Sequence, residues 1–306
     1  MTAVPDETPV APAIDRKGLA ALLVGTGIIA WSVVFVRFAD VGPMSSAAWR
    51  LIFALPVLWV WTGHLAAKRR NEAGPAAPAP RVPLTPSMLI FIALGGLAFA
   101  LDVAAFHLAL RATDVANASF IANIAPILVV IGGAVFYAEH PPAKIWGAFG
   151  LALFGSWIMA GLLAPTRLGA GDLFAVGAAI FYASYLLIMK RVRGAFDGPS
   201  ATLWTGVVSG VALVIMALAA GETFVPQSVK GWAAVIALGV LSHAGGQGLT
   251  SVAVGRVPVG IVALVLLAWA PASTFIGWAV LGETMSLQQA IGAAVIMAAL
   301  VIARPK

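Results

Sequence analysis

Cysteine is absent from this 306-residue chain, and charged residues are scarce. Without cysteine, neither a disulfide nor a thiolate metal site can form. The GxxxxGK[ST] pattern of ATP-binding loops is also missing, and the histidines lack the HExxH spacing of zinc enzymes. We therefore expect no catalytic residues, no metal, no cofactor and no enzymatic activity.

Hydrophobic residues make up 61% of the sequence and charged residues only 10%, which excludes an ordinary soluble fold. A helix needs about 20 apolar residues to cross a bilayer. Ten continuously apolar segments meet this requirement, whereas the strands of a membrane barrel would alternate in polarity. We predict an all-α membrane protein with ten transmembrane helices at residues 17–38, 44–62, 87–110, 115–137, 143–163, 171–190, 200–220, 231–253, 258–280 and 286–303.

The basic residues are distributed unevenly between the two ends of the predicted helices. If the N-terminus is cytoplasmic, thirteen of the eighteen lie on the cytoplasmic side: Arg16, Lys17, Lys68, Arg69, Arg70, Arg81, Lys144, Lys190, Arg191, Arg193, Arg256, Arg304 and Lys306. The positive-inside rule then predicts that both termini of this multi-pass membrane protein lie in the cytoplasm. The net charge of +6 reflects this topology and not a nucleic-acid-binding surface.

Two stretches about 145 residues apart repeat one pattern. The first runs from Ala125-Pro126 to Glu139 and the second from Ala270-Pro271 to Glu283, with Ile-Gly and Ala-Val pairs between them. The chain is therefore a duplicated unit. Because each copy contains five predicted spans, an odd number, the two five-helix repeats are expected to be inverted, which is typical of secondary transporters.

The duplication divides the chain into three parts. Residues 1–16 form a polar cytoplasmic tail, residues 17–163 a first repeat and residues 171–303 a second repeat. Residues 63–86, which contain five prolines, are expected to form a mobile cytoplasmic linker within the first repeat.

Further short stretches complete a pattern that covers nearly the whole chain. They are Trp31-Ser32 leading to Pro43 and Arg50, Gly171-Asp172 followed by Tyr182, Tyr185 and Lys190-Arg191, and LGVLS at 238–242. With the duplicated stretches, this pattern resembles the EamA family of the drug/metabolite transporter superfamily. The resemblance implies the movement of small organic solutes across the bacterial inner (plasma) membrane, foremost the export of amino acids or related metabolites.

Asp102 lies within the third apolar segment, where a charged side chain costs about 2.5–3.5 kcal/mol. Phe99 and Phe106 share its helical face. An acid between aromatic side chains can hold a substrate ammonium group or carry a proton, so we predict that Asp102 lies in the substrate pathway. The alternative is a structural salt bridge with Arg50, whose own role we expect to be structural.

His243, Gln247 and Thr250 are spaced at i, i+4 and i+7 in the eighth apolar segment. On an α-helix this spacing gives one polar stripe near the middle of the membrane. Glycines between these residues permit close approach of a ligand or a helix. We predict that the stripe faces the substrate pathway, and the alternative is hydrogen bonding to another helix.

Aromatic side chains within the spans are candidates for the walls of the same pathway. A binding site for an organic solute needs apolar walls with a few polar anchors. The wall candidates are Trp31, Tyr182, Tyr185 and Trp269, and Asn117 is a further polar candidate. For each of them, packing or a hydrogen bond between helices is the alternative.

Pro126 and Pro271 lie near the middle of the fourth and ninth spans. A proline within a helix removes one hydrogen bond and clashes with the preceding turn. The carbonyls freed near positions 122 and 267 need a neighbour, water or substrate as a partner. We predict a hinge at each proline, with a static kink as the alternative.

These patterns favour a secondary transporter that works by alternating access around one central site. Its expected partners are a small-molecule substrate and the lipid bilayer, with no nucleic acid, and the oligomeric state is open. The alternatives are a channel or facilitator, or a multidrug exporter, with the same fold, and an intramembrane enzyme.

Overall fold

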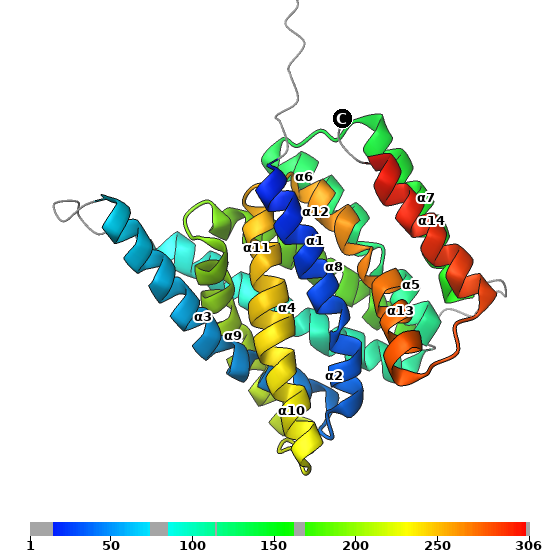
Figure 1. Ribbon diagram of the computed structural model, residues 1–306, viewed down its shortest axis with the longest axis horizontal. Coiled ribbons are helices and arrows are strands. Elements are labelled where there is room, and N and C mark those ends of the chain that lie inside the picture. Colours follow the sequence, from blue (N-terminus) through cyan, green and yellow to red (C-terminus); the bar gives the residue numbers. More distant parts are fainter. Residues whose placement is uncertain (1–14, 74–84, 114, 162–168, 304–306) are drawn as a thin grey trace, which may run out of the picture.

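The computed structural model describes residues 15–73, 85–113, 115–161 and 169–303, without the side chains of 110, 111, 115–117 and 119. Every regular element in these ranges is a helix (Figure 1). In chain order they are α1 (Arg16–Ala30), α2 (Ser32–Phe38), α3 (Pro43–Ala73), α4 (Pro86–Ala112), α5 (Val115–Ala122), α6 (Ala125–Tyr137), α7 (Ala143–Ala160), α8 (Ala170–Arg193), α9 (Gly198–Ala219), α10 (Val229–Ala237), η1 (Leu238–Gln247), α11 (Gly248–Val254), α12 (Val259–Leu266), α13 (Trp269–Leu281) and α14 (Leu287–Ala303).

Nine helical segments of the described chain are long and apolar enough to cross a membrane. Four of them join several elements: α1 with α2, α5 with α6, α10 through α11, and α12 with α13. The helix α14 is a shorter apolar helix of 17 residues. The fold is therefore an all-helical membrane bundle, as its composition predicts.

The helix α3 extends further than the sequence led us to expect. Residues 63–73, placed above in a linker, continue the helix as far as Ala73. The physical reason is that this stretch, HLAAKRRNEA after Gly63, is rich in strong helix formers and its first proline is Pro75. Residues 74–84 of the expected linker lie outside the described residues, and Pro86 begins α4.

Helices are interrupted beside both predicted hinge prolines. The segment containing Pro126 breaks between Ala122 and Ala125, and the segment containing Pro271 breaks between Leu266 and Trp269. At the second break, the backbone N–H of Ala270 donates to the carbonyl oxygen of Leu267 at 3.3 Å. Of the partners considered above for the carbonyl at 267, which were a neighbour, water or substrate, the structure therefore shows a neighbouring backbone group.

The segment from Val229 to Val254 contains a π-helix, η1, at its centre. Its hydrogen bonds span five residues instead of four, which changes the direction of successive side chains. Gly239 and Gly246 allow this widened turn to pack directly on the backbones of α3 and α1, since a Cβ atom at either glycine would lie within 3.0 Å of a backbone oxygen there. Sequence spacing alone did not predict this irregular helix.

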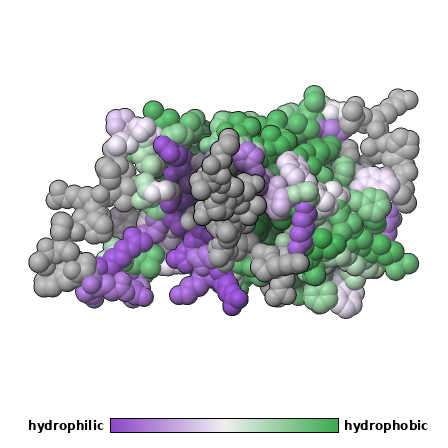
Figure 2. All heavy atoms as spheres, turned by 90° about the horizontal axis from the view of Figure 1, so that it is seen from above, coloured by the Kyte–Doolittle hydropathy of each residue, from purple (hydrophilic) through white to green (hydrophobic). Residues whose placement is uncertain are grey.

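The helices α7 and α14 pack side by side at one margin of the bundle (Figure 1). Gly155 and Gly292 face each other there, and a Cβ atom on either would lie less than 3 Å from the carbonyl oxygen of the other. In Figure 2, which views the molecule from the top of Figure 1, hydrophobic side chains cover much of the upper and right-hand margin, and hydrophilic ones extend from near the centre to the lower left edge. This arrangement suits a bundle whose outer surface contacts lipid.

Candidate functional site

A cavity of about 770 Å³ lies between the two halves of the chain. Its walls come from α2, α3 and α4 of the first half and from η1 and α13 of the second. The lining residues are Ser32, Val33, Val36, Arg37, Ser46, Ala47, Arg50, Phe99, Asp102, Val103, Phe106, His107, Leu238, Trp269, Ser273, Thr274, Leu281 and Glu283. Half of these side chains are apolar or aromatic and half are polar or charged, so the cavity offers both apolar walls and polar anchors to an organic solute.

The cavity has a buried floor and an exposed rim. Leu238 and Phe99 on the floor are 1% and 6% exposed, whereas Arg37 and Glu283 at the rim are exposed. The rim belongs to the end of the bundle where α2 and α13 terminate, which we call the Glu283 end. The cavity is therefore open at this end of the molecule.

Of the four charged residues that line the cavity, Arg37 and Glu283 are exposed at the rim, and Arg50 and Asp102 lie deeper. Arg50 comes from α3 and Asp102 from α4, and both side chains are half-buried. No ion pair within 4.0 Å joins them in the described part of the chain. The salt bridge considered above as an alternative role for Asp102 is therefore not formed, although the two charges interact through space.

His243 and Gln247 lie behind the floor of the cavity. Neither lines the cavity, whereas Phe99 does. The centroid of the Phe99 ring lies 5.6 Å from that of His243 and 5.1 Å from that of Tyr185. The side-chain amide of Gln247 donates a hydrogen bond to the Tyr185 hydroxyl oxygen at 3.1 Å. Tyr182 stacks on Tyr185, with centroids 6.3 Å apart. Tyr185, His243 and Gln247 are buried and Tyr182 is partly buried. These four residues form a polar layer beneath Phe99, which we call the sub-floor layer.

Thr250 does not continue the predicted polar stripe. It is fully buried against Gly25 of α1, and its hydroxyl donates to the carbonyl oxygen of Gly246 at 3.0 Å. The stripe was inferred from regular α-helical spacing, and the π-helix η1 breaks that spacing before Thr250 is reached. Thr250 thus faces a neighbouring helix.

The remaining predicted residues fall into three different places. Trp269 lines the cavity, as Asp102 does. Trp31 lies at the break between α1 and α2, is 42% exposed and is not among the lining residues. Asn117 belongs to α5, but its side chain lies outside the described part of the chain. The sequence also did not single out His107, Arg37 and Glu283 as cavity residues.

The opposite end of the bundle, which we call the Glu139 end, is closed by polar contacts. Glu139 accepts a hydrogen bond from the backbone N–H of Val259, the first residue of α12, at 3.0 Å. It also forms an ion pair with Lys190 of α8. Tyr137 donates to the carbonyl oxygen of Leu187 at 2.5 Å. These contacts join the end of α6 to two helices of the second half.

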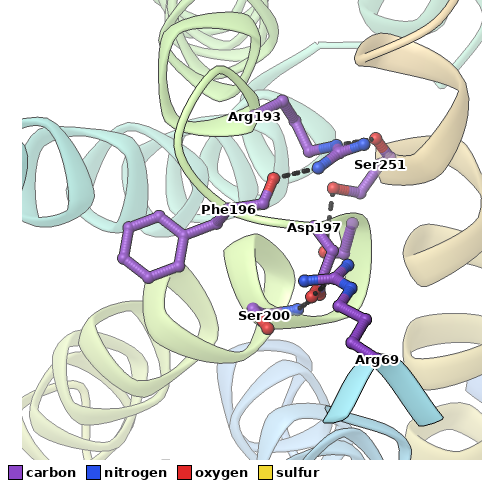
Figure 3. Close-up of polar contacts among 7 residues, drawn as sticks. Arg69, Arg193, Phe196, Asp197, Ser200 and Ser251 are labelled. Atoms are coloured by element: carbon purple, nitrogen blue, oxygen red, sulfur yellow. Dashed lines mark hydrogen bonds and ion pairs between the residues drawn. The ribbon is translucent and has the colours of Figure 1, made fainter. Parts of the chain in front are cut away.

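A second group of contacts closes the same end near α9 (Figure 3). Arg193 donates to the carbonyl oxygen of Ser251 at 2.7 Å and also to the carbonyl oxygen of Phe196. Asp197 accepts from the backbone N–H of Ser200 at 2.9 Å and pairs with Arg69 of α3 at 3.0 Å. The ends of α3, α8, α9 and α11 are thereby held together.

Glu139 and Glu283 have the same local backbone but different partners. Each backbone N–H bonds the carbonyl six residues earlier, in Gly133 and Gly277, and each follows a residue with positive φ. Glu139 is paired, whereas no hydrogen bond or ion pair of the Glu283 carboxylate is formed within the described residues. The duplicated motif is therefore engaged at the closed end and free at the open end.

The sequence profile of the EamA-like transporter family matches this chain twice, over residues 16–161 and 169–304. The chain belongs to the EamA-like transporter family. Membership of the drug/metabolite transporter superfamily follows, and the resemblance predicted from the duplicated motif is confirmed. With its apolar helices, this EamA-like protein is a multi-pass membrane protein of the transporter type.

Proteins of similar sequence are named as transporters, but their names do not identify a transported solute. An uncharacterized transporter of Archaeoglobus fulgidus is 29% identical over 203 residues, covering 66% of this chain and 72% of that protein. The uncharacterized transporter YxxF of Bacillus subtilis is 29% identical over 137 residues, which cover 44% of this chain and 43% of that protein. One crystal structure at 19% identity has a TM-score of 0.72 and covers 93% of this EamA-like chain and 98% of the other, which shows a shared fold.

Proposed function

We propose that this EamA-like protein is a secondary transporter that exports small organic solutes, foremost amino acids or related metabolites, across the bacterial inner membrane. It does so by alternating access. The observation that carries the proposal is the cavity, which has walls from both halves and whose exposed lining residues Arg37 and Glu283 lie at the Glu283 end, while polar contacts join the helices at the Glu139 end. A solute bound there would contact both halves at once, so that their relative movement changes the end from which it is accessible.

The proposed architecture has ten spans in two inverted repeats, residues 17–163 and 171–303, with both termini in the cytoplasm. The contact between Glu139 and Val259 supports inversion, because it brings the end of α6 to the beginning of α12. The broken helices that carry the two motifs therefore run in opposite directions at this contact. With cytoplasmic termini, the Glu139 end faces the cytoplasm and the cavity opens outward.

Glu139 and Glu283, the two glutamates of the duplicated motif, offer a mechanism for closing either end. In the described conformation Glu139 is paired with Lys190, while Arg37 and Glu283 both line the open rim. Closure of the rim would bring Arg37 and Glu283 together, and opening of the other end would separate Lys190 from Glu139. The protein thus exchanges one ion pair for another as it changes state.

Labelling of single cysteines tests alternating access, since the chain has no cysteine of its own. Thr274→Cys reports on the cavity and Ser251→Cys on the closed end. A membrane-impermeant maleimide is expected to label Thr274→Cys from outside. Addition of Glu139→Gln, which removes the charge paired with Lys190, should lower this labelling and raise that of Ser251→Cys from the cytoplasmic side.

The matched control is Glu72→Gln, because Glu72 forms only an exposed contact with Lys68 at 3.9 Å. It should leave both labelling rates unchanged. If Glu139→Gln and saturating solute change neither rate, alternating access is wrong. Counterflow in proteoliposomes separates a carrier from a channel, and an absence of flux for every amino acid in a panel would reject the proposed substrate class.

A further inference from the structure

The further inference concerns Arg50, the cationic residue within the cavity, and rests on the proposed transport function. An arginine among apolar helices normally requires an anionic partner, because placing its charge in the bilayer core costs about 2.5–3.5 kcal/mol. Asp102 lies on the same cavity but does not form a close ion pair with it within the described residues. The Arg50 Nε atom is buried and has no hydrogen-bond partner there.

Two opposite charges thus line one cavity without neutralising each other by direct contact. Both side chains are half-buried, so part of each faces the space between them. A guanidinium group binds a carboxylate through two parallel N–H donors, and a carboxylate accepts from an ammonium group. A solute that carries both groups would satisfy both residues in one binding event.

The apolar walls of the cavity can accept the remainder of such a solute. Phe99, Phe106 and Trp269 line it together with several aliphatic side chains. A volume of about 770 Å³ is large enough for a small organic molecule with a bulky side chain. The sub-floor layer then acts from behind Phe99 and does not contact the solute directly.

We propose that Arg50 binds the anionic group of the transported solute and Asp102 its cationic group, so that the cavity selects zwitterions. This assignment reverses the structural role that the sequence suggested for Arg50. It also gives the two residues separate parts in specificity: loss of either charge removes one anchor, and a solute with only one charged group leaves the other residue unsatisfied.

The test uses the full-length protein in proteoliposomes and begins with counterflow of a panel of radiolabelled L-amino acids. The amino acid with the largest flux is then challenged with its decarboxylated amine and its deaminated acid. Each analogue is expected to need a concentration at least about tenfold higher than the parent amino acid to inhibit its counterflow equally. Arg50→Gln and Asp102→Asn should each weaken apparent affinity by at least about thirtyfold, since each leaves a charge of the solute unpaired in a buried site.

Arg50→Lys provides a graded variant, because it keeps the charge but loses the paired donors, and its affinity should lie between those of wild type and Arg50→Gln. The controls Lys68→Gln and Glu72→Gln alter exposed charges outside the cavity and should behave as wild type. If Arg50→Gln does not fold, as judged by size-exclusion chromatography, the analogue competition and Arg50→Lys decide the question.

The outcomes separate this inference from the proposed function. If the wild type transports an amino acid but a folded Arg50→Gln keeps its affinity, or either analogue competes as well as the parent, the zwitterion assignment is wrong and the transport function stands. If the wild type transports no amino acid at all, the proposed substrate class itself fails.

Discussion

The side-chain amide of Gln247 donates a hydrogen bond to the Tyr185 hydroxyl oxygen at 3.1 Å, and both side chains are buried. This bond ties η1 to α8 beneath the cavity floor. Hydrogen bonds between membrane helices average about 0.6 kcal/mol, and a buried group left without a partner costs about 1–3 kcal/mol. We expect Tyr185→Phe and Gln247→Leu each to lower the free energy of unfolding by about 1 kcal/mol.

A double-mutant cycle measured by unfolding in mixed micelles checks this expectation. The double variant should be less destabilised than the sum of the two single variants, because neither partner is then left alone. Additive effects would show that the hydrogen bond contributes nothing to stability.

Glycine at positions 155 and 292 is required for the close contact of α7 with α14. A Cβ atom at Gly155 would lie 2.8 Å from the carbonyl oxygen of Gly292, and the reverse distance is 2.5 Å. Gly155→Ala and Gly292→Ala should therefore force the helices apart and destabilise the protein by about 1–3 kcal/mol. Thermal unfolding in detergent measures the effect.

Gly147 and Gly150 on the same helix provide matched controls, since a Cβ atom at either would meet nothing within 4 Å. Gly147→Ala and Gly150→Ala should be neutral or stabilising by about 0.5–1 kcal/mol. Equal destabilisation at all four positions would contradict a packing role for the Gly155–Gly292 contact.

Asp40, in the loop between α2 and α3, should make stability depend on pH. Hydrogen bonds from the Ser228 side chain and then from the Gln227 backbone N–H, at 3.2 Å, hold the pKa of the Asp40 carboxyl below its ordinary value. A carboxyl with a lowered pKa in the folded state stabilises it above the unfolded-state pKa of about 3.9, and this contribution is lost as the pH falls through the folded-state pKa.

Asp40→Asn is accordingly expected to lower the thermal midpoint at pH 7 and to differ less from wild type near pH 3. Paired melting curves at the two pH values measure the change. The exposed-acid variant Glu72→Gln serves as a control with little effect at either pH. An equally large Asp40→Asn effect at both pH values would argue against a charge-dependent role.

Pro126 and Pro271 should matter for movement more than Pro56 does. The helix α3 continues through Pro56, whereas the helices beside the other two prolines are interrupted. Pro271→Ala restores a backbone N–H that can bond Leu267, which would favour a continuous helix. We expect Pro126→Ala and Pro271→Ala to slow counterflow about tenfold, equivalent to about 1.4 kcal/mol in the barrier, and Pro56→Ala to have little effect. Equal rates for all three would support a static kink.

The membrane spans could be predicted from sequence because each depends on a long run of apolar residues, and such runs are read without knowledge of packing. The duplicated motif was equally visible, since Pro126 and Pro271 recur in matching surroundings. Asp102 and Trp269 could be singled out because a charged or large aromatic residue within a span needs a reason to be there. Both line the cavity, and their contact with a solute stays a prediction.

Other features depend on contacts that no single segment encodes. The π-helix η1 depends on close packing of Gly239 and Gly246 against two other helices, so regular spacing misplaced Thr250. The placement of Phe99 in front of His243 depends on how α4 packs against η1. The structural role expected for Arg50 rested on a possible salt bridge with Asp102, and whether that bridge forms depends on how α3 packs against α4.

The different partners of Glu139 and Glu283 have an energetic consequence. If each state of the protein contains one glutamate ion pair and leaves the other open, the pairs nearly cancel when the two states are compared. Partly exposed ion pairs contribute about 0–1 kcal/mol each. The ion pairs therefore add little to the free-energy difference between the two states. A solute that binds one state a few kilocalories per mole more strongly can then reverse their populations. Under the proposed mechanism, the duplicated glutamates therefore leave the protein responsive to its solute instead of fixed in one conformation.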